Sequence, residues 1–289
     1  YTLVTPVPSP AGDRVAFLDL HTVDEVAPCS APPLGAPQVA NYICANQPLL
    51  GAATLRVRNV AATGPYSADP SIAVTFPGTD PTFRGGGPGP YVQQINALQA
   101  LHREEQALLF RPSWSPDGQR IVVSNGTRLL SWQVGSASFD TIPNTLGGLS
   151  PSWSPDGQWI AFTEYVRGDS ASYTCSCTSP TRAGSALHTR TLVSVSATRL
   201  VVMRPDGTDR TVLGEGEDAT WSPDGQFIYA VQNDLVVRFP RSGGGTVTIP
   251  NTQRARSPSI SPDGRWLAFS RAKLQETRDH DIWLVSLTQ

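Results

Sequence analysis

Short, continuous apolar runs recur along the chain, and each is bounded by glycine, proline and small polar residues. Four of them are Ile121–Val123, Ile160–Phe162, Ile228–Ala230 and Leu267–Phe269. Continuous rather than alternating apolar character predicts strands that are buried on both faces, as in a sheet packed between two others. Further strand patterns follow the runs at a regular distance. They include Leu129–Val134, Phe139–Ile142, Leu235–Phe239 and Val247–Ile249.

A tight-turn motif precedes each apolar run. The copies read PSWSPDGQRIVVS from residue 112, PSWSPDGQWIAFT from 151, ATWSPDGQFIYAV from 219 and PSISPDGRWLAFS from 258. Ser-Pro-Asp-Gly suits a β-turn because proline presets the second φ angle, aspartate suits the third position and glycine tolerates the exit. Asp117 and Asp156 lie 39 residues apart, as do Asp224 and Asp263. A weaker copy, SPAGDRVAF from residue 9, has Ala11 at the aspartate position.

A large aromatic residue precedes the motif serine in three of the four full copies. These residues are Trp114, Trp153 and Trp221, and Ile260 occupies the position in the last copy. One tryptophan per unit predicts a packing contact between neighbouring units that buries roughly 150–250 Å².

Four strands in each 39-residue unit are typical of β-propeller blades. The 106 residues between Ala11 and Asp117 leave room for one degenerate blade, with Ser71–Phe76 as its inner strand. The sequence therefore predicts an all-β protein with six four-stranded antiparallel blades, or five if residues 77–110 are an insertion.

We expect a single propeller domain over residues 1–289, with insertions at about 21–53, 77–110 and 165–198. The last blade ends with Asp281–Leu287 as its third strand. Tyr1–Thr5 is a candidate for the missing outer strand, which would join the two ends of the ring.

The four copies of Trp/Ile-Ser-Pro-Asp-Gly resemble the TolB-type propeller repeat. That repeat also occurs in the propeller domains of prolyl-oligopeptidase-type peptidases and in many exported bacterial proteins. The resemblance extends from about residue 5 onward and implies a six-bladed propeller. TolB carries an additional N-terminal domain and binds an outer-membrane lipoprotein. For this chain we expect the propeller alone.

Three irregular segments share one topological position. Residues 21–53, 165–198 and 271–280 each follow a predicted second strand, so we expect all three on the ring face opposite the Ser-Pro-Asp-Gly turns. Binding usually resides in loops grouped on one face of a scaffold. In a six-blade order the two longer insertions belong to blades one and four and could meet over the channel mouth. Candidate partner-binding residues are Tyr42, Tyr165, Arg167, Asp169, Tyr173, Arg182, His188, Arg278, Asp279 and His280.

The cysteines also lie in the two longer insertions. They are Cys29, Cys44, Cys175 and Cys177, an even number that favours disulfides in an exported protein. A Cys29–Cys44 bond, a strained Cys175–Cys177 bond and cross-pairing between the insertions are all compatible with the sequence. A redox-active pair, a metal site and free thiols are further alternatives.

The composition and the motifs of the chain argue against several classes of function. A net charge of −2 without any basic block makes nucleic acid a poor candidate partner. No apolar run reaches the roughly 18–20 residues of a membrane-spanning helix. The chain contains no G-x-S-x-G, H-E-x-x-H or G-x-x-x-x-G-K pattern, so the sequence predicts no catalytic residue, cofactor or metal ion.

The single methionine, Met203, and the first residue, Tyr1, fit a processed precursor, and we expect a periplasmic or extracellular protein. We predict a non-enzymatic scaffold or accessory subunit of a cell-envelope assembly, docking another protein through the face with the three segments. Membrane association would come only through partners or a lost N-terminal anchor. Two alternatives are a lyase or hydrolase with a site at the channel mouth, and a self-assembling surface protein.

Overall fold

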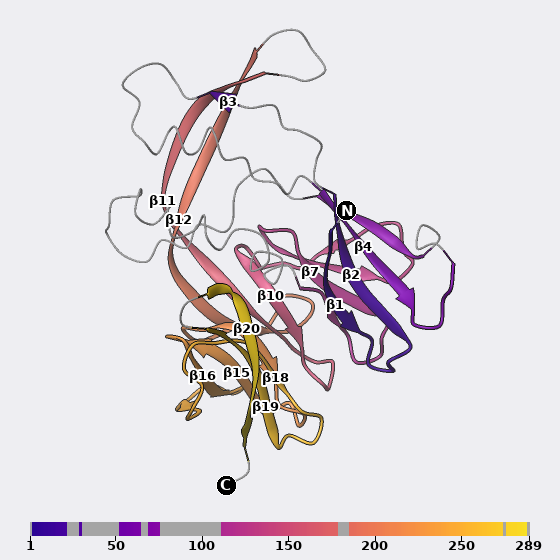
Figure 1. The fold of residues 1–289 in the computed structure, drawn as a ribbon, viewed down its shortest axis with the longest axis vertical. Helices are drawn as coiled ribbons and strands as arrows, with labels where there is room; N and C mark the ends of the chain where they lie inside the picture. The colour runs from indigo at the N-terminus through magenta and orange to yellow at the C-terminus, as the bar shows by residue number, and fades with distance from the viewer. Residues whose placement is uncertain are drawn as a thin grey trace.

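The computed structural model describes residues 2–21, 29–30, 52–64, 69–75, 111–178, 185–273 and 276–287. Within these residues the chain forms strands and turns but no helix, and the strands make five antiparallel sheets (Figure 1). Each sheet is one blade of a β-propeller. The all-β propeller is therefore confirmed, with five blades, the smaller of the two predicted counts.

The blades follow the chain in order. The first blade contains β1 (Thr2–Pro8), β2 (Arg14–His21), β4 (Ala52–Asn59) and β5 (Ser71–Thr75). The second contains β6 (Ser113–Trp114), β7 (Arg120–Ser124), β8 (Leu129–Gln133) and β9 (Asp140–Thr141). The third contains β10 (Gly148–Trp153), β11 (Ile160–Thr178), β12 (Ser185–Met203) and β13 (Thr211–Gly214), and β3 (Cys29–Ser30) pairs with β11.

The last two blades differ in their number of strands. The fourth contains β14 (Glu217–Trp221), β15 (Phe227–Gln232), β16 (Leu235–Pro240) and β17 (Val247–Thr248). The fifth contains β18 (Ala255–Ile260), β19 (Trp266–Lys273) and β20 (Glu276–Ser286). In every blade the Ser-Pro turn joins the first two strands, as the repeat predicts.

Two predicted strand positions are wrong. Ser71–Phe76 does not open a separate blade, because β5 pairs with the edge of β4, with Thr75 opposite Ala52, and completes the first sheet. Tyr1–Thr5 does not close the last blade, because β1 is the inner strand of the first blade and pairs with β2. With one blade fewer, the two long insertions belong to blades one and three rather than one and four.

The Ser-Pro-Asp-Gly turns are held by a repeated set of side-chain hydrogen bonds. In the fourth blade, the Ser222 hydroxyl donates to Asp224 at 2.5 Å and accepts from the Phe227 amide at 2.9 Å. The Asp224 carboxylate also accepts from the Gln226 amide at 3.0 Å. Gly225 has φ +67°, and its amide closes the turn by donating a hydrogen bond to the Ser222 carbonyl oxygen. Equivalent bonds occur at Ser115, Ser154 and Ser261.

The weak copy in the first blade reaches the same arrangement with a different residue. Ala11 cannot accept the serine hydroxyl, and Asp13 does so instead, with 2.8 Å between Ser9 Oγ and Asp13 Oδ1. The Arg14 amide in turn donates to Ser9 Oγ at 3.1 Å. The turn therefore survives a two-residue shift of its aspartate.

Two of the three motif tryptophans donate a hydrogen bond to the preceding blade. Trp114 and Trp221 are each 6% exposed, and their indole nitrogens donate to the carbonyl oxygens of Val7 and Ser152 in the preceding blade. Trp153 is only partly buried: it packs against the layer between the second and third blades, and its indole nitrogen donates to the Gly157 carbonyl within its own turn at 3.1 Å. The motif position therefore contributes to packing between blades in all three copies, but it supplies an indole hydrogen bond to the preceding blade in only two.

The hydrophobic core consists of layers between consecutive blades. Leu18 and Trp132 belong to the layer between the first two blades, and Leu129 and Phe162 to the next. Two further layers join the third blade to the fourth and the fourth to the fifth. Among the described residues, no such layer joins the fifth blade to the first.

Candidate functional site

The third blade carries the largest departure from a regular propeller. β11 and β12 stay paired from Ile160 opposite Met203 to Thr178 opposite Ser185. Their neighbours β10 and β13 pair with them only as far as Glu164 and Leu200. Beyond that point the two strands form a ribbon, here called the arm (residues 167–178 and 185–196), that projects from the ring (Figure 1). At about 3.3 Å per residue the arm is roughly 40 Å long.

The two long insertions meet at the arm. β3, which lies within the 21–53 segment of the first blade, pairs antiparallel with β11 near its end. Ser30 lies opposite Ser176, and Cys29 lies opposite Cys177. The second blade separates the first from the third along the ring, so this pairing joins blades that are not neighbours.

The third predicted segment, 271–280, is also a strand extension. β19 and β20 remain paired to Lys273 opposite Glu276. In Figure 1 the end of this hairpin, the arm, the end of β2 and the start of β4 all lie on the upper side of the blades. One side of the propeller therefore carries all three elaborations.

The base of the arm is fixed to the ring. Glu164 is mostly buried and pairs with Arg210, and Arg199 lies 3.6 Å from the same carboxylate. The Tyr165 amide donates to the Gly147 carbonyl at 2.9 Å. Gly147 has φ +77°, and a Cβ there would collide with the Tyr165 backbone. These contacts anchor the base of the arm to the ring.

The predicted partner-binding residues fall into three groups. Tyr165 is 5% exposed and belongs to the core, so it supports the arm rather than its surface. The backbone places Arg167, Asp169 and Tyr173 on β11 and His188 on β12. Arg278, Asp279 and His280 lie on β20. Tyr42 and Arg182, like Cys44 among the cysteines, lie outside the described residues.

The central channel is polar and has unusual backbone geometry. Ser150, Asp218 and Ser257 occupy equivalent places in the inner strands, with φ of +48°, +55° and +49°, and line a cavity of about 100 Å³. Each lies at a bulge, where the strand register shifts. Such left-handed residues store strain. We did not predict them, although a small polar residue four positions before the motif serine recurs in these copies.

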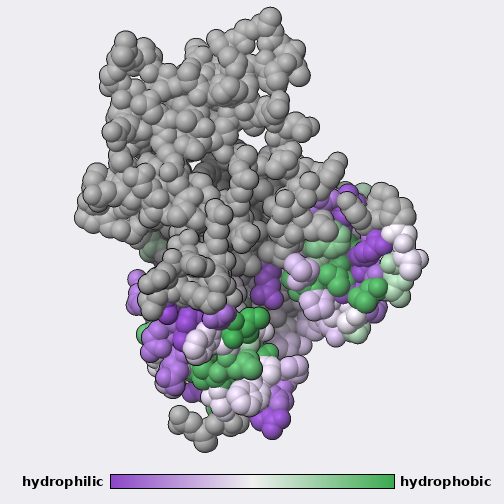
Figure 2. Space-filling view, in the orientation of Figure 1, coloured by the Kyte–Doolittle hydropathy of each residue, from purple (hydrophilic) through white to green (hydrophobic). Residues whose placement is uncertain are grey.

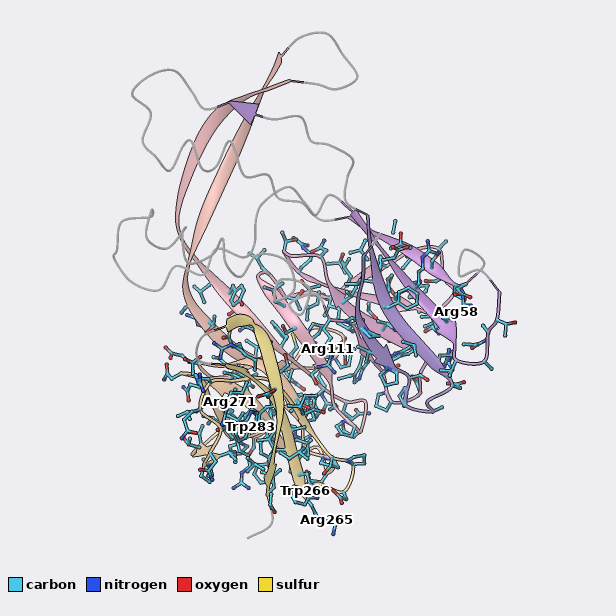
Figure 3. The ribbon with its side chains drawn as sticks, viewed as in Figure 1. Arg58, Arg111, Arg265, Trp266, Arg271 and Trp283 are labelled. Atoms are coloured by element: carbon cyan, nitrogen blue, oxygen red, sulfur yellow. The ribbon has the colours of Figure 1, made fainter. Side chains whose placement is uncertain are left out.

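Arg111 adds a positive charge to the channel lining (Figure 3). Desolvation lowers the pKa of its guanidinium, and the negative charge of Asp218 opposes that shift. An arginine stays protonated at neutral pH even so. The Ser150 hydroxyl lies 3.4 Å from the Asp218 carboxylate. The channel thus combines one cation and one carboxylate among its described lining residues.

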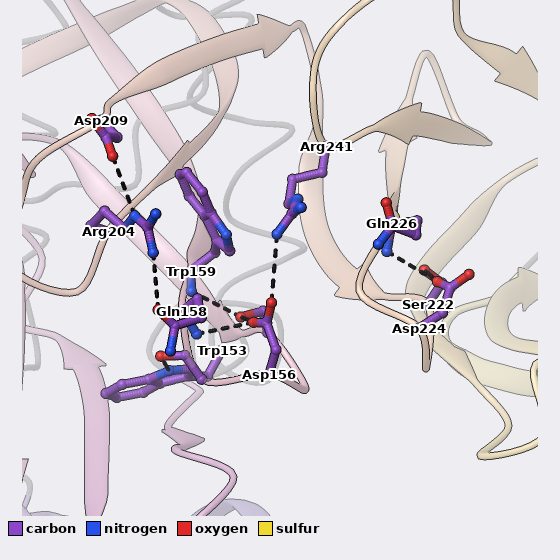
Figure 4. Close-up of polar contacts among 12 residues, drawn as sticks. Trp153, Asp156, Gln158, Trp159, Arg204, Asp209, Ser222, Asp224, Gln226 and Arg241 are labelled. Atoms are coloured by element: carbon purple, nitrogen blue, oxygen red, sulfur yellow. Dashed lines mark hydrogen bonds and ion pairs between the residues drawn. The ribbon is translucent and has the colours of Figure 1, made fainter.

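The opposite side of the ring is occupied by a compact charged cluster. The Trp159 ring lies 4.3 Å from the Arg204 guanidinium and 5.2 Å from that of Arg241 (Figure 4). Arg204 pairs with Asp209 at 3.3 Å, and Arg241 lies 3.5 Å from Asp156. These charges have partners within the cluster, which fits a structural link between the third and fourth blades.

The fifth blade exposes apolar side chains on the face that no described blade covers. Trp266, Ile282 and Leu284 are 46%, 81% and 64% exposed. Figure 2 shows hydrophobic residues at the surface of this part of the molecule. Trp283 lies on the other side of β20 and stacks with Arg271 at 4.2 Å (Figure 3).

The described residues contain no group of three or more histidine, cysteine, aspartate or glutamate side chains that could hold a metal ion. Among the same residues, no helix is long and apolar enough to cross a membrane.

No protein-family model and no curated protein matches the chain. Among solved structures, TolB from Acinetobacter baumannii matches with a TM-score of 0.51 and 13% identity, over 97% of this chain and 52% of that one. A putative TolB from Agrobacterium tumefaciens matches with a TM-score of 0.44 and 19% identity, over 61% and 57%. An oligogalacturonate lyase in complex with manganese matches with a TM-score of 0.49 and 11% identity, over 99% of this chain and 64% of that one.

The chain thus spans about half the length of the TolB structures that it matches. The Acinetobacter structure shows the fold, a TolB-like β-propeller, as the repeat motif predicts. At these identities the comparisons support the fold of the chain but not its function.

Proposed function

We propose that the protein is a non-enzymatic docking scaffold that binds another protein through the arm and the β19–β20 hairpin on the same side of the ring. The observation that carries this proposal is the arm itself. A propeller blade needs strands of about five or six residues, as in β15 and β16, whereas β11 and β12 have 19 residues each. The additional length extends beyond the strands β10 and β13 that flank β11 and β12 in the blade.

A ribbon of two strands would also be stabilised by a partner. An isolated two-stranded ribbon is marginally stable in water. Within the described part of the chain, only the two residues of β3 pair with the arm beyond the ring. Strand edges of this kind are templates for an added strand from another chain. The partner is therefore a protein that supplies an extended segment to an arm edge.

The same proposal includes location in an oxidising compartment, the periplasm or the exterior of the cell. Four cysteines in the two segments that meet at the arm favour such a compartment. The TolB-like fold is compatible with an accessory subunit of an envelope assembly. An enzyme with a site at the channel mouth and a self-assembling protein remain alternative predictions.

Site-specific crosslinking tests the proposal. A photoreactive phenylalanine analogue replaces Tyr173 or His188 on the arm, and the matched control places it at Asp206, an exposed residue of the β12–β13 turn on the opposite side. In living cells of the producing organism, we expect one dominant protein adduct from the arm positions and none of that adduct from position 206. Adducts from position 206 alone, or from no position, would contradict the proposal.

A further inference from the structure

The position of β3 selects among the cysteine connectivities. β3 consists of two residues, and its antiparallel register with β11 places Cys29 directly opposite Cys177. Directly opposite residues in antiparallel strands have Cα atoms about 4.5–5.5 Å apart and lie on the same face of the sheet. A disulfide requires a Cα separation of about 4.4–6.8 Å. From this register we infer that Cys29 and Cys177 form a disulfide that fastens the first-blade insertion to the arm.

The other pairings of the cysteines on β3 and β11 fit less well. Cys175 lies two residues from Cys177 on β11, so it is the diagonal neighbour of Cys29. Diagonal Cα atoms are about 7–8 Å apart, beyond the usual span of a disulfide. Cys175 and Cys177 themselves are separated by two strand residues, about 6.6 Å, which is at the upper limit. The opposite pair is the one that needs no backbone movement.

Bond formation requires an oxidant, and a small-molecule disulfide such as oxidised glutathione is sufficient. The thiolate of one cysteine attacks the disulfide, which releases one glutathione thiol and leaves a mixed disulfide. The second cysteine then displaces the other glutathione and forms the protein S–S bond. In total, two protein thiols are oxidised to one disulfide and one glutathione disulfide is reduced to two glutathione thiols. The protons of the two protein thiols pass to the two glutathione thiols.

The bond has a structural consequence that is independent of any partner. A two-residue strand offers few backbone hydrogen bonds, so pairing alone holds β3 weakly to β11. A covalent link between positions 29 and 177 fixes the contact across two non-adjacent blades. Reduction would leave only the backbone pairing of β3 to hold positions 29 and 177 together.

Peptide mapping of the full chain tests the assignment. The protein, purified after export, is blocked with N-ethylmaleimide without reduction and digested with trypsin. Cleavage at the flanking arginines yields peptide 15–56, with Cys29 and Cys44, and peptide 168–182, with Cys175 and Cys177. We expect the two peptides to be crosslinked, and chymotryptic cleavage after Tyr42 to leave the Cys29 half attached.

Two double variants decide which cysteine of the arm is involved. Cys44→Ser with Cys175→Ser retains Cys29 and Cys177, and Cys44→Ser with Cys177→Ser retains Cys29 and Cys175. The first should give the crosslinked peptide in nearly all molecules, whereas the second should carry two maleimides. The assignment would be overturned by equal crosslinking of both variants or by a Cys29–Cys44 bond in the wild type. It would also be overturned if the four thiols of the native protein were free or retained zinc.

Discussion

The indole nitrogen of Trp221 in the fourth blade donates a hydrogen bond to the carbonyl oxygen of Ser152 in the third blade, at 2.9 Å. Trp114 makes the same contact with Val7 across the boundary between the first two blades, at 3.0 Å. Each ring therefore supplies both buried area and one directional contact across a blade boundary. That combination fixes how one blade lies against the next.

Replacing Trp221 should be far more costly than replacing an exposed tryptophan. Trp221→Ala should lower the free energy of unfolding by about 3–5 kcal/mol, because it removes a buried ring and leaves a cavity. Trp221→Phe keeps most of the area and should cost about 1 kcal/mol for the lost hydrogen bond. Trp266→Ala, at a site 46% exposed, should cost less than about 1 kcal/mol. Urea unfolding of the three variants measures these differences, and equal costs would contradict the blade packing described above.

Gly147 should tolerate no side chain. Gly147→Ala combines a left-handed φ of +77° with a collision between the new Cβ and the Tyr165 backbone at the base of the arm. Gly12→Ala is the matched control, because Gly12 has φ +73° but no heavy atom within 4 Å of the added carbon. The control should cost about 1–2 kcal/mol for backbone strain alone. Gly147→Ala should cost at least about 2 kcal/mol more, and thermal unfolding that finds the two variants equally stable would contradict this geometry.

A buried threonine supports the connection between the fourth and fifth blades. The Thr252 hydroxyl donates to the Ile249 carbonyl at 2.7 Å and accepts from the Val236 amide at 3.0 Å. Thr252→Val keeps the shape but leaves the Val236 amide without this acceptor, which should cost about 1–3 kcal/mol. Thr252→Ser retains the hydroxyl and should recover at least half of that loss. Chemical denaturation compares the two, and a valine variant as stable as the wild type would refute the role of the hydroxyl.

The turn aspartates should make stability depend on pH in the acid range. Hydrogen bonds from the motif serines lower the pKa of Asp117, Asp224 and Asp263 in the folded protein. A carboxyl group with a lower pKa in the folded state stabilises the fold above its unfolded pKa of about 3.9 and loses that contribution as the pH falls further.

The wild type should therefore lose stability between about pH 4 and pH 2. Exchanging all three aspartates for asparagine should make that loss less steep, because the amide does not titrate. Urea unfolding at several pH values gives the slope, and an identical slope for the triple variant would show that these turns do not carry the pH dependence.

The repeat made the turns and inner strands predictable because their signals are local. Ser-Pro-Asp-Gly specifies its own hydrogen bonds within five residues, so Asp156 and Asp224 could be placed without any tertiary information. The repeated Ile-Pro-Asn-Thr at 142–145 and 249–252 is equally local, but we did not recognise it. In both copies the threonine hydroxyl bonds the isoleucine carbonyl three residues earlier.

Non-local pairing accounts for the predictions that were wrong. The strand Ser71–Thr75 has no turn motif of its own, and only the exposed edge of β4 determines which sheet it joins. The arm contains alternating segments such as Val193-Ser194-Val195-Ser196, a period typical of strands, yet a long insertion was expected to be loop. The approach of Cys29 to Cys177 depends on two insertions from different blades and has no local signal.

The arm is the element on which the proposed function depends, and it can be removed without disturbing the ring. Arg167 and Val195 are cross-strand partners, so replacing residues 168–194 with Asn-Gly joins them by a two-residue hairpin turn. The base contacts of Glu164 and the core position of Tyr165 lie outside the deletion. The control variant is Arg204→Ala, in the charged cluster on the opposite side of the ring.

The most direct test is the dissociation constant of the partner identified by crosslinking, measured by calorimetry for the wild type, the arm deletion and Arg204→Ala. We predict that the arm deletion weakens binding by at least about 100-fold, close to 2.7 kcal/mol, while Arg204→Ala binds like the wild type. An arm deletion that remains folded and binds the partner with wild-type affinity would contradict docking through the arm.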